Sequence, residues 1–191
     1  MDGVDGVDGV DGVDGVDGTD GEDGADGMDA EFPITIDQLS FSKIGTFTNG
    51  NDEAFAEISA FDTATNKLFI VNPEENEVSV LDLTDATNPV KGTSIALAGN
   101  PNSVAVHNGV LAVAVENMDK QADGTIETFA TDTQSLLVSY PAGALPDMVA
   151  FSPDGEYIVS ANEGEPNDDY TVDPEGSITI VEVATETVTQ V

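Results

Sequence analysis

The sequence contains no cysteine, no tryptophan and no arginine, and it has a single histidine, His107. Without cysteine, the chain forms no disulfide, holds no thiolate-bound metal and has no cysteine nucleophile. One histidine is too few for a histidine-rich zinc site, and no spacing in the chain indicates a Ser-His-Asp triad. We therefore expect His107 to be an ordinary residue at the end of a strand, and no catalytic residue is identified.

Positive charge is also scarce, because only four lysines oppose 38 acidic residues and the formal net charge is -34. A charge of this sign and size repels nucleic acid and anionic membrane surfaces, so neither is an expected partner. The acidic excess suits a medium rich in salt or divalent cations, since screening weakens the self-repulsion of the folded chain. Divalent cations are therefore expected partners.

Long hydrophobic runs are absent as well. No stretch of 18 apolar residues occurs, and Met1 leads into aspartates instead of a basic and then apolar leader. We expect no direct membrane insertion and no signal peptide in this chain, so an exported protein would carry its signal upstream of this sequence.

Residues 2–27 repeat Asp-Gly-X with a strict period of three. Glycine and charge in this density are typical of a disordered segment, so residues 1–30 are expected to form a flexible, acidic linker. Two alternatives are a weak cation-binding tract and a collagen-like oligomeriser. Collagen draws its stiffness from proline, however, and the first proline of this chain is Pro33.

The second expected domain, residues 31–191, is all-β. Short apolar runs rich in β-branched residues are punctuated by turn signals such as Asn-Gly at 108–109 and Ser-Pro-Asp-Gly at 152–155. The expected strands are 41–48, 56–62, 67–72, 77–83, 102–108, 110–116, 124–130, 146–152, 156–162 and 176–183.

An internal repeat indicates the architecture. Segments beginning at Ile58, Ser103 and Met148 can be superposed, and these positions are 45 residues apart. A period of about 45 residues with three or four strands and no helix is typical of a β-propeller blade, whereas a two-sheet sandwich requires no such repeat. About three to four blades fit the chain, so we expect the N-terminal part of a longer propeller. The remaining blades of the parent chain are its expected partners. Without them, sheet edges would stay open.

Residues 144–183, and above all the motif ANEGEPNDDYTVDPEGS at 161–177, resemble the choice-of-anchor I family. The resemblance implies a bacterial β-propeller of the YVTN or WD40-like kind that is extracellular or attached to the cell surface. Many similar proteins carry the label alkaline phosphatase, so the resemblance also invites a hydrolase activity. The Asp-Gly-X tract is not part of it.

Acidic loops are expected at one end of the propeller, because they follow the equivalent strands that end at Asn72, Glu116 and Asn162. Calcium takes six to eight oxygen ligands from carboxylates, amides and carbonyls, and it is the expected cofactor. A solvated loop without metal and a catalytic metal site are the alternatives, and Tyr170 is expected to pack across the longest loop. The candidate metal ligands are Glu116, Asp119, Glu163, Glu165, Asp168, Asp169, Asp173 and Glu175.

Three functions remain open from the sequence. The first is a non-catalytic, calcium-stabilised binding or scaffold module for an unknown extracellular ligand. The second is a metal-dependent phosphoric ester hydrolase, in which metals would have to supply most of the positive charge that arginine usually provides. The third is a self-associating component of a surface layer.

Overall fold

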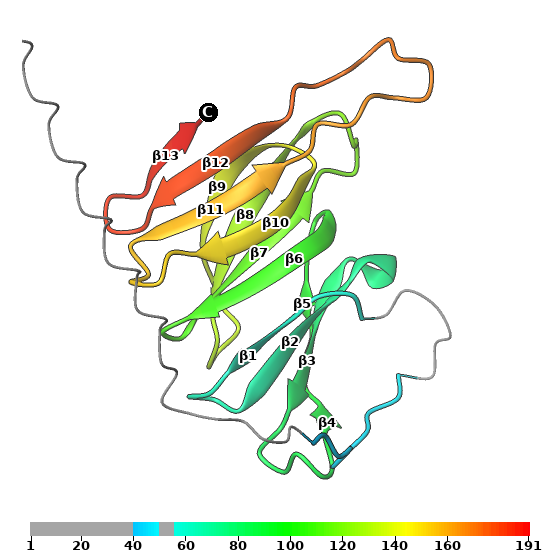
Figure 1. Ribbon diagram of the computed structural model, residues 1–191, viewed down its shortest axis with the longest axis vertical. Helices are drawn as coiled ribbons and strands as arrows, with labels where there is room; N and C mark the ends of the chain where they lie inside the picture. Colours follow the sequence, from blue (N-terminus) through cyan, green and yellow to red (C-terminus); the bar gives the residue numbers. More distant parts are fainter. Residues whose placement is uncertain (1–39, 50–55) are drawn as a thin grey trace, which may run out of the picture. The chain divides into compact units, whose positions relative to one another are not determined.

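The computed structural model describes residues 40–49 and 56–191. All of its strands lie in one compact unit, Ser42–Val191 (Figure 1). The Asp-Gly-X tract and the expected domain boundary at residue 31 lie outside the described residues. Within them, the expected all-β class is confirmed: three antiparallel sheets follow one another along the chain, and the only helical turn there is a short 3-10 turn, η1 (Pro73–Glu75).

Each sheet is built from strands that are consecutive in the sequence, so no strand crosses from one sheet to another. The first sheet contains β1 (Ser59–Asp62), β2 (Lys67–Asn72), β3 (Glu77–Asp82), β4 (Val90–Lys91) and β5 (Ile95–Ala96). The middle sheet contains β6 (Asn100–His107), β7 (Val110–Glu116), β8 (Asp123–Ala130) and β9 (Leu136–Ala144). The third sheet contains β10 (Pro146–Phe151), β11 (Tyr157–Asn162), β12 (Ser177–Glu182) and β13 (Thr187–Gln190).

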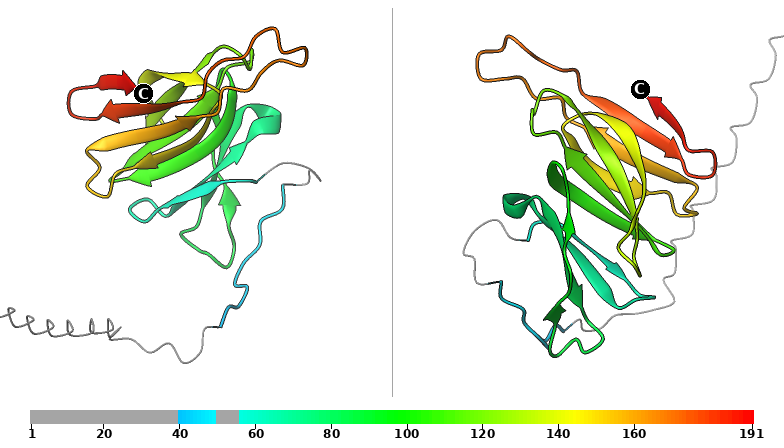
Figure 2. Two further views of the ribbon diagram at one scale, coloured as in Figure 1. Left: turned by 45° about the horizontal axis from the view of Figure 1, so that its top comes forward. Right: turned by 180° about the vertical axis from the view of Figure 1, so that it is seen from behind.

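The 45-residue repeat is visible in the strand register. Phe61 pairs with Leu68 in the first sheet, and Val106 pairs with Leu111 in the middle sheet. Phe151 occupies the same place in the third sheet, where it pairs with Ile158. The first strands of the three sheets also contact one another, since β6 packs against both β1 and β10. This succession of similar sheets with adjoining first strands is β-propeller-like (Figure 2).

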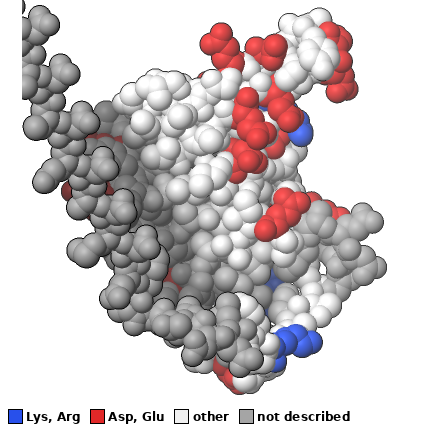
Figure 3. Space-filling model, viewed as in Figure 1, with Lys and Arg blue, Asp and Glu red and all other residues white. Residues whose placement is uncertain are grey.

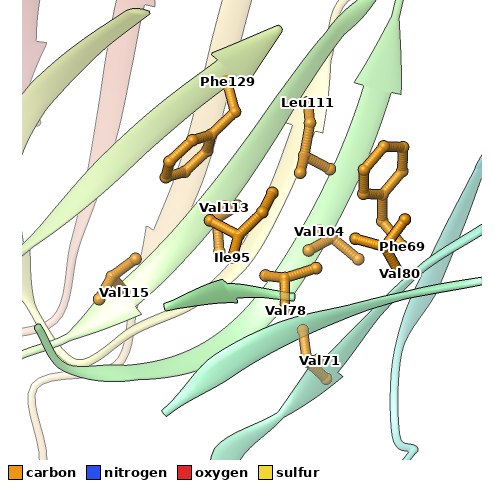
Figure 4. Close-up of a cluster of buried hydrophobic side chains, with 10 residues drawn as sticks. All are labelled: Phe69, Val71, Val78, Val80, Ile95, Val104, Leu111, Val113, Val115 and Phe129. Atoms are coloured by element: carbon orange, nitrogen blue, oxygen red, sulfur yellow. The ribbon is translucent and has the colours of Figure 1, made fainter. Parts of the chain in front are cut away.

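The middle sheet lies between the other two and is buried on both faces. On one face, the larger side chains of β7 (Leu111, Val113 and Val115) pack with Phe69 and other residues of the first sheet (Figure 4). On the opposite face, the buried apolar residues that β7 presents toward the third sheet are Ala112 and Ala114. The alternation of large residues and alanine along β7 thus reflects two buried apolar faces, one with large and one with small side chains. It does not indicate one buried face and one solvated face.

The interface between the middle and third sheets is filled from both sides. Val149, Ile158 and Val181 of the third sheet pack with Ile126 and Tyr140 of the middle sheet and with the two alanines of β7. All of these side chains are buried. Small residues on β7 therefore leave room for the larger ones on its neighbours, as close packing requires.

The hairpin turns bridge neighbouring sheets. The Asn-Gly turn has positive φ at both residues, 45° at Asn108 and 79° at Gly109, as a type I′ turn demands. His107 is confirmed as the last residue of β6, and its ring lies 5.6 Å from that of Phe151 in the third sheet. The ring also covers Gly155, where an added Cβ would come within 2.3 Å of it.

The strand prediction for residues 41–48 was wrong, and strands β4, β5 and β9 were not predicted. Residues 41–48 form no strand in the part of the chain that the structure describes. Ile44 and Phe47 instead help line a pocket against Leu68, Ile70 and Leu81 of the first sheet. Strand β9 was not predicted, because Pro141 and Gly143 interrupt its pattern; a proline is tolerated there because β9 is the last strand of its sheet.

Replacing Leu111 by alanine should lower the free energy of unfolding by about 2–5 kcal/mol, because the side chain is fully buried between two sheets and its removal leaves a cavity. Leu137→Ala is the matched control, since this leucine is 51% exposed, and its effect should stay within about 0.5 kcal/mol. Urea unfolding of both variants measures the difference. Equal losses of stability would contradict the central position of the middle sheet.

Candidate functional site

Three loops that follow the second strand of each sheet carry a concentration of carboxylates. They are η1 after β2, residues 117–122 after β7, and residues 163–176 after β11. Figure 3 shows carboxylates gathered at the end of the molecule where the loops after β7 and β11 lie. The expectation that acidic loops recur after equivalent strands is therefore confirmed for the described residues.

The longest of these loops is organised around one amide side chain, that of Asn167. Its Oδ1 accepts hydrogen bonds from the backbone N–H groups of Thr171 and Val172, at 2.9 and 3.0 Å. Its Nδ2 donates to the hydroxyl of Thr171, and that hydroxyl in turn donates to Asp169. The hydrogen bond from Thr171 lowers the pKa of Asp169. Local hydrogen bonds thus shape this loop.

The base of the same loop is fixed by glycine and by the preceding strand. Gly164 has a φ of 65°, and an added Cβ would lie 2.5 Å from the carbonyl oxygen of Pro174 on the returning limb. The N–H of Glu163 donates to the carbonyl of Leu145 at 2.9 Å. Gly164 therefore occupies a tight turn that a larger residue would strain. Tyr170, in contrast, is 78% exposed, so the prediction that it packs across the loop was wrong.

The eight candidate metal ligands divide into two groups. Glu116 is buried at the end of β7, whereas the other seven are exposed in the loops. Three of them (Asp119, Glu165 and Asp168) line one open pocket of about 480 Å³ between the loops after β7 and β11. Gln121 bridges these loops by donating to the carbonyl of Glu165 at 3.3 Å.

No three acidic or histidine side chains lie close enough to hold one metal ion anywhere in residues 40–49 and 56–191. Exposure keeps the loop carboxylates hydrated, which limits their mutual repulsion to about 1 kcal/mol for a pair 4 Å apart in water. The binding of calcium by the eight carboxylates stays a prediction.

Polar side chains also end the second strand of each sheet, and they are buried between the sheets. Asn72 in the first sheet and Asn162 in the third occupy equivalent places, and Glu116 stands at this place in the middle sheet. Asn162 donates to the hydroxyls of Ser177 and Thr179, at 3.0 and 2.9 Å. A buried polar group needs such partners, because leaving it unpaired costs about 1–3 kcal/mol.

In the first sheet the corresponding network is centred on Glu77. Its Oε1 accepts hydrogen bonds from Ser79 at 2.7 Å and Ser94 at 2.9 Å, and it also pairs with Lys91 at 3.3 Å. Burial by itself would raise the pKa of this carboxyl. The hydrogen bonds from the two serines and from Lys91 outweigh that effect and lower the pKa below its usual value of 4.5.

The middle sheet lacks an equivalent network. Glu116 Oε2 accepts a long hydrogen bond of 3.4 Å from Asn102, while Oε1 is buried and has no hydrogen bond. The nearest cation is Lys120, whose Nζ is 3.9 Å from Oε1. Of the three strand ends, only this one has a buried carboxylate oxygen with no hydrogen bond.

Sequence reasoning missed Asn167 and Glu77. The signal for Asn167 was present, since Asn followed by Asp, Tyr and Thr within a loop is typical of an Asx turn. Glu77 gave no such signal: it reads as the first residue of an exposed strand, and its partners Lys91 and Ser94 reach it only through the pairing of β3 with β4 and β5. No helix among the described residues is long and apolar enough to cross a membrane.

Glu77→Gln should lower the free energy of unfolding at pH 7 by about 1–3 kcal/mol, because a hydrogen-bonded carboxylate is lost. Since the folded-state pKa lies below 4.5, the stability from ionised Glu77 is complete above that pH and disappears as the pH falls through the folded-state pKa. The difference in the free energy of unfolding between the variant and the native chain should therefore disappear in acid. Glu75→Gln, at an exposed residue of η1, is the control, and a gap that is the same at pH 3 and pH 7 would contradict the assignment.

Asn167→Ala should free the loop at 163–176 without unfolding the sheets, because its bonds are confined to that loop. Hydrogen exchange of the Thr171 and Val172 amides should become faster, while exchange in β11 and β12 stays unchanged. Asn88→Ala, at another exposed turn, should leave the loop amides protected. Unchanged exchange in the Asn167 variant would show that the loop is held by other means.

Comparison with known proteins supports the fold. No curated protein matches the chain. Among solved structures, hydrazine synthase of Kuenenia stuttgartiensis is 22% identical, with a TM-score of 0.56 over 71% of this chain and 36% of that one. A protein of unknown function from Desulfotomaculum acetoxidans is 10% identical, with a TM-score of 0.56 over 78% of this chain and 44% of that one.

At these identities the likeness concerns the fold alone, and this chain spans less than half the length of either protein. A family model is more specific. The model of the choice-of-anchor I domain matches residues 57–191, which include all three sheets and the three acidic loops. The chain therefore belongs to the choice-of-anchor I family.

Proposed function

We propose that this chain is a binding or scaffold module of a β-propeller protein that is attached to the cell surface and exposed to the extracellular medium. One observation carries the proposal: carboxylate-rich loops follow the second strand of each sheet, and those after β7 and β11 share one open pocket. Such a surface attracts cations and repels anions. Its ligand is accordingly a cationic group, or an anionic one bridged by a divalent metal.

Calcium is the divalent cation that we propose for the loops. Asp119, Glu165 and Asp168 line the shared pocket. Because these carboxylates do not converge on a single point, water would complete the coordination and the affinity would be low. Dissociation constants of about 10⁻⁴–10⁻³ M are usual for extracellular calcium modules and would suit this loop pair.

The remaining blades of the parent protein are the second proposed partner. Three apolar side chains of the third sheet are each at least 40% exposed: Met148, Tyr157 and Ile178. Other apolar residues of the same strands are buried against the middle sheet. An apolar sheet face of this kind is covered in a closed propeller by the next blade.

A metal-dependent phosphoric ester hydrolase is the alternative that the family resemblance invites. It would need several ligands around one metal ion and positive charge for the phosphoryl group. The described residues bring no three acidic or histidine ligands together, and the chain has no arginine. No specific observation therefore favours hydrolysis over binding.

Thermal unfolding of the full chain tests the calcium proposal. Calcium at 100 times its dissociation constant should stabilise one specific site by about 2.7 kcal/mol, or about 5–10 °C for a domain of this size. The double variant Asp168→Asn, Asp169→Asn should lose most of this shift. Magnesium, and sodium chloride at matched ionic strength, are the controls: equal small shifts in all three salts would mean that the carboxylates are only screened.

A further inference from the structure

The third sheet has an outer face on which no further sheet is packed among the described residues. Val181 of β12 is buried against the middle sheet, so Ile178 and Ile180 of the same strand point the other way. Ile178 is 44% exposed. A stack of repeats that ends in solvent normally has a polar outer face, so an apolar one indicates a partner.

The strand register shows what this outer face corresponds to in the other two sheets. Counted from the first hairpin of each sheet, Val78, Ile126 and Ile178 occupy one equivalent position on the third strand. Val78 and Ile126 are fully buried, because each packs against the sheet that follows it in the chain. Ile178 is the third member of this set, and it has no such cover in the described part of the chain.

The first sheet carries the other half of such an interface, which we call the receiving face. Leu111 in the middle sheet and Ile158 in the third are buried in the same clusters as Val78 and Ile126, and they form the receiving side of the two internal interfaces. Leu68 is at the equivalent position of the first sheet, which no other sheet precedes among the described residues. The two ends of the stack are therefore complementary in the same way as the sheets within it.

The receiving face is apolar and incompletely filled. Leu68 and Ile70 line a pocket of about 480 Å³ that is bounded by residues 43–47, and both also line a smaller pocket of about 210 Å³. Phe61, which pairs with Leu68, is 45% exposed. Space for an apolar side chain thus exists at the place where, in the internal interfaces, the preceding sheet contributes one.

We propose that two copies of this chain associate head to tail, with the outer face of the third sheet of each copy on the receiving face of the other. Ile178 of one copy enters the pocket beside Leu68 and Ile70 of the other copy. Because each copy contributes both faces, two identical interfaces close a ring. Three sheets from each copy give six, which is within the usual four to eight blades of a propeller.

Charge favours this head-to-tail contact over a contact between two third sheets. Residues 146–191 contain no lysine or arginine, and Glu182 lies on the same side of β12 as Ile178. Two third sheets would therefore bring carboxylates of the same sign together. Lys43 lines the pocket of the receiving face, so the head-to-tail contact brings a basic side chain to the acidic sheet.

This inference rests on the proposed function in one respect, namely that the outer face of the third sheet takes another blade. It names a second copy as the source of that blade, because the same chain carries the complementary face. The net charge of -34 on each copy opposes the association. Salt screens this repulsion, so the two copies should associate more tightly at high ionic strength.

Sedimentation velocity of the full chain, over about a hundredfold range of concentration and at low and high sodium chloride, tests the proposal. A reversible change from one chain to two is expected, with tighter association in high salt. A single chain at every concentration would overturn the second copy as partner, and it would leave further blades on the same polypeptide as the cover of the third sheet. A mass that keeps growing beyond two chains would overturn the closed ring.

Two variants test the head-to-tail arrangement. Ile178→Asp and Phe61→Asp change exposed residues, and each should weaken association at least about tenfold, because both interfaces of the ring contain one copy of each residue. Mixing the two variants should restore a pair of chains, since Ile178→Asp keeps the receiving face intact and Phe61→Asp keeps the third sheet intact. Val172→Asp, at a 50% exposed residue of the loop 163–176, is the control and should associate like the native chain.

The mixture also distinguishes the competing arrangement. If Phe61→Asp associates like the native chain while Ile178→Asp does not, the two copies meet through their third sheets, and the head-to-tail arrangement is refuted. The absence of restoration in a mixture of two variants that keep the β-sheet signal in circular dichroism would refute it as well. The concentration series of the native chain decides the second-copy partner even where a variant loses that signal.

Discussion

The double-sided burial of the middle sheet is the constraint on which the rest of the structure depends. Strand β7 supplies large side chains to one interface and alanines to the other. The size of these side chains therefore limits how closely each neighbouring sheet can approach the middle sheet. Hairpin contacts then fix the sheets at their edges: Lys67 of the first sheet donates to the carbonyl of Thr131 at 2.9 Å, and His107 covers Gly155 of the third. Because burial of apolar area is the main favourable term, the order of the sheets follows from these two interfaces.

Polar groups inside those interfaces show how the same architecture is satisfied in different ways. The first sheet uses a carboxylate surrounded by hydroxyls and a lysine, and the third uses an amide between two hydroxyls. The middle sheet keeps a carboxylate but has glycine and isoleucine where the other sheets place donors or acceptors. The partners of this carboxylate are instead Asn102 and Lys120, which lie outside the strand that pairs with the end of β7.

The negative charge of the candidate ligands is compatible with this fold because seven of the eight lie outside the interfaces. Nearly all the candidate ligands are exposed in loops at one end, where water limits the repulsion between them. The longest loop is shaped by the hydrogen bonds of Asn167 and by the tight turn at Gly164, and Asp169 takes part through its hydrogen bond from Thr171. These carboxylates are therefore accessible from the solvent.

The sequence alone determined the all-β class, the 45-residue repeat, the family and the position of the acidic loops, because these depend on local patterns that recur along the chain. It predicted residues 41–48 as a strand, since alternation does not show whether a ladder partner exists, and it missed β9, whose proline and glycine are tolerated only in a last strand. Only the tertiary structure separated Glu116 from the exposed carboxylates. The reason is physical: burial and hydrogen-bond partners come from residues that are distant in sequence, such as Asn102 and Gly124, and no local pattern records them.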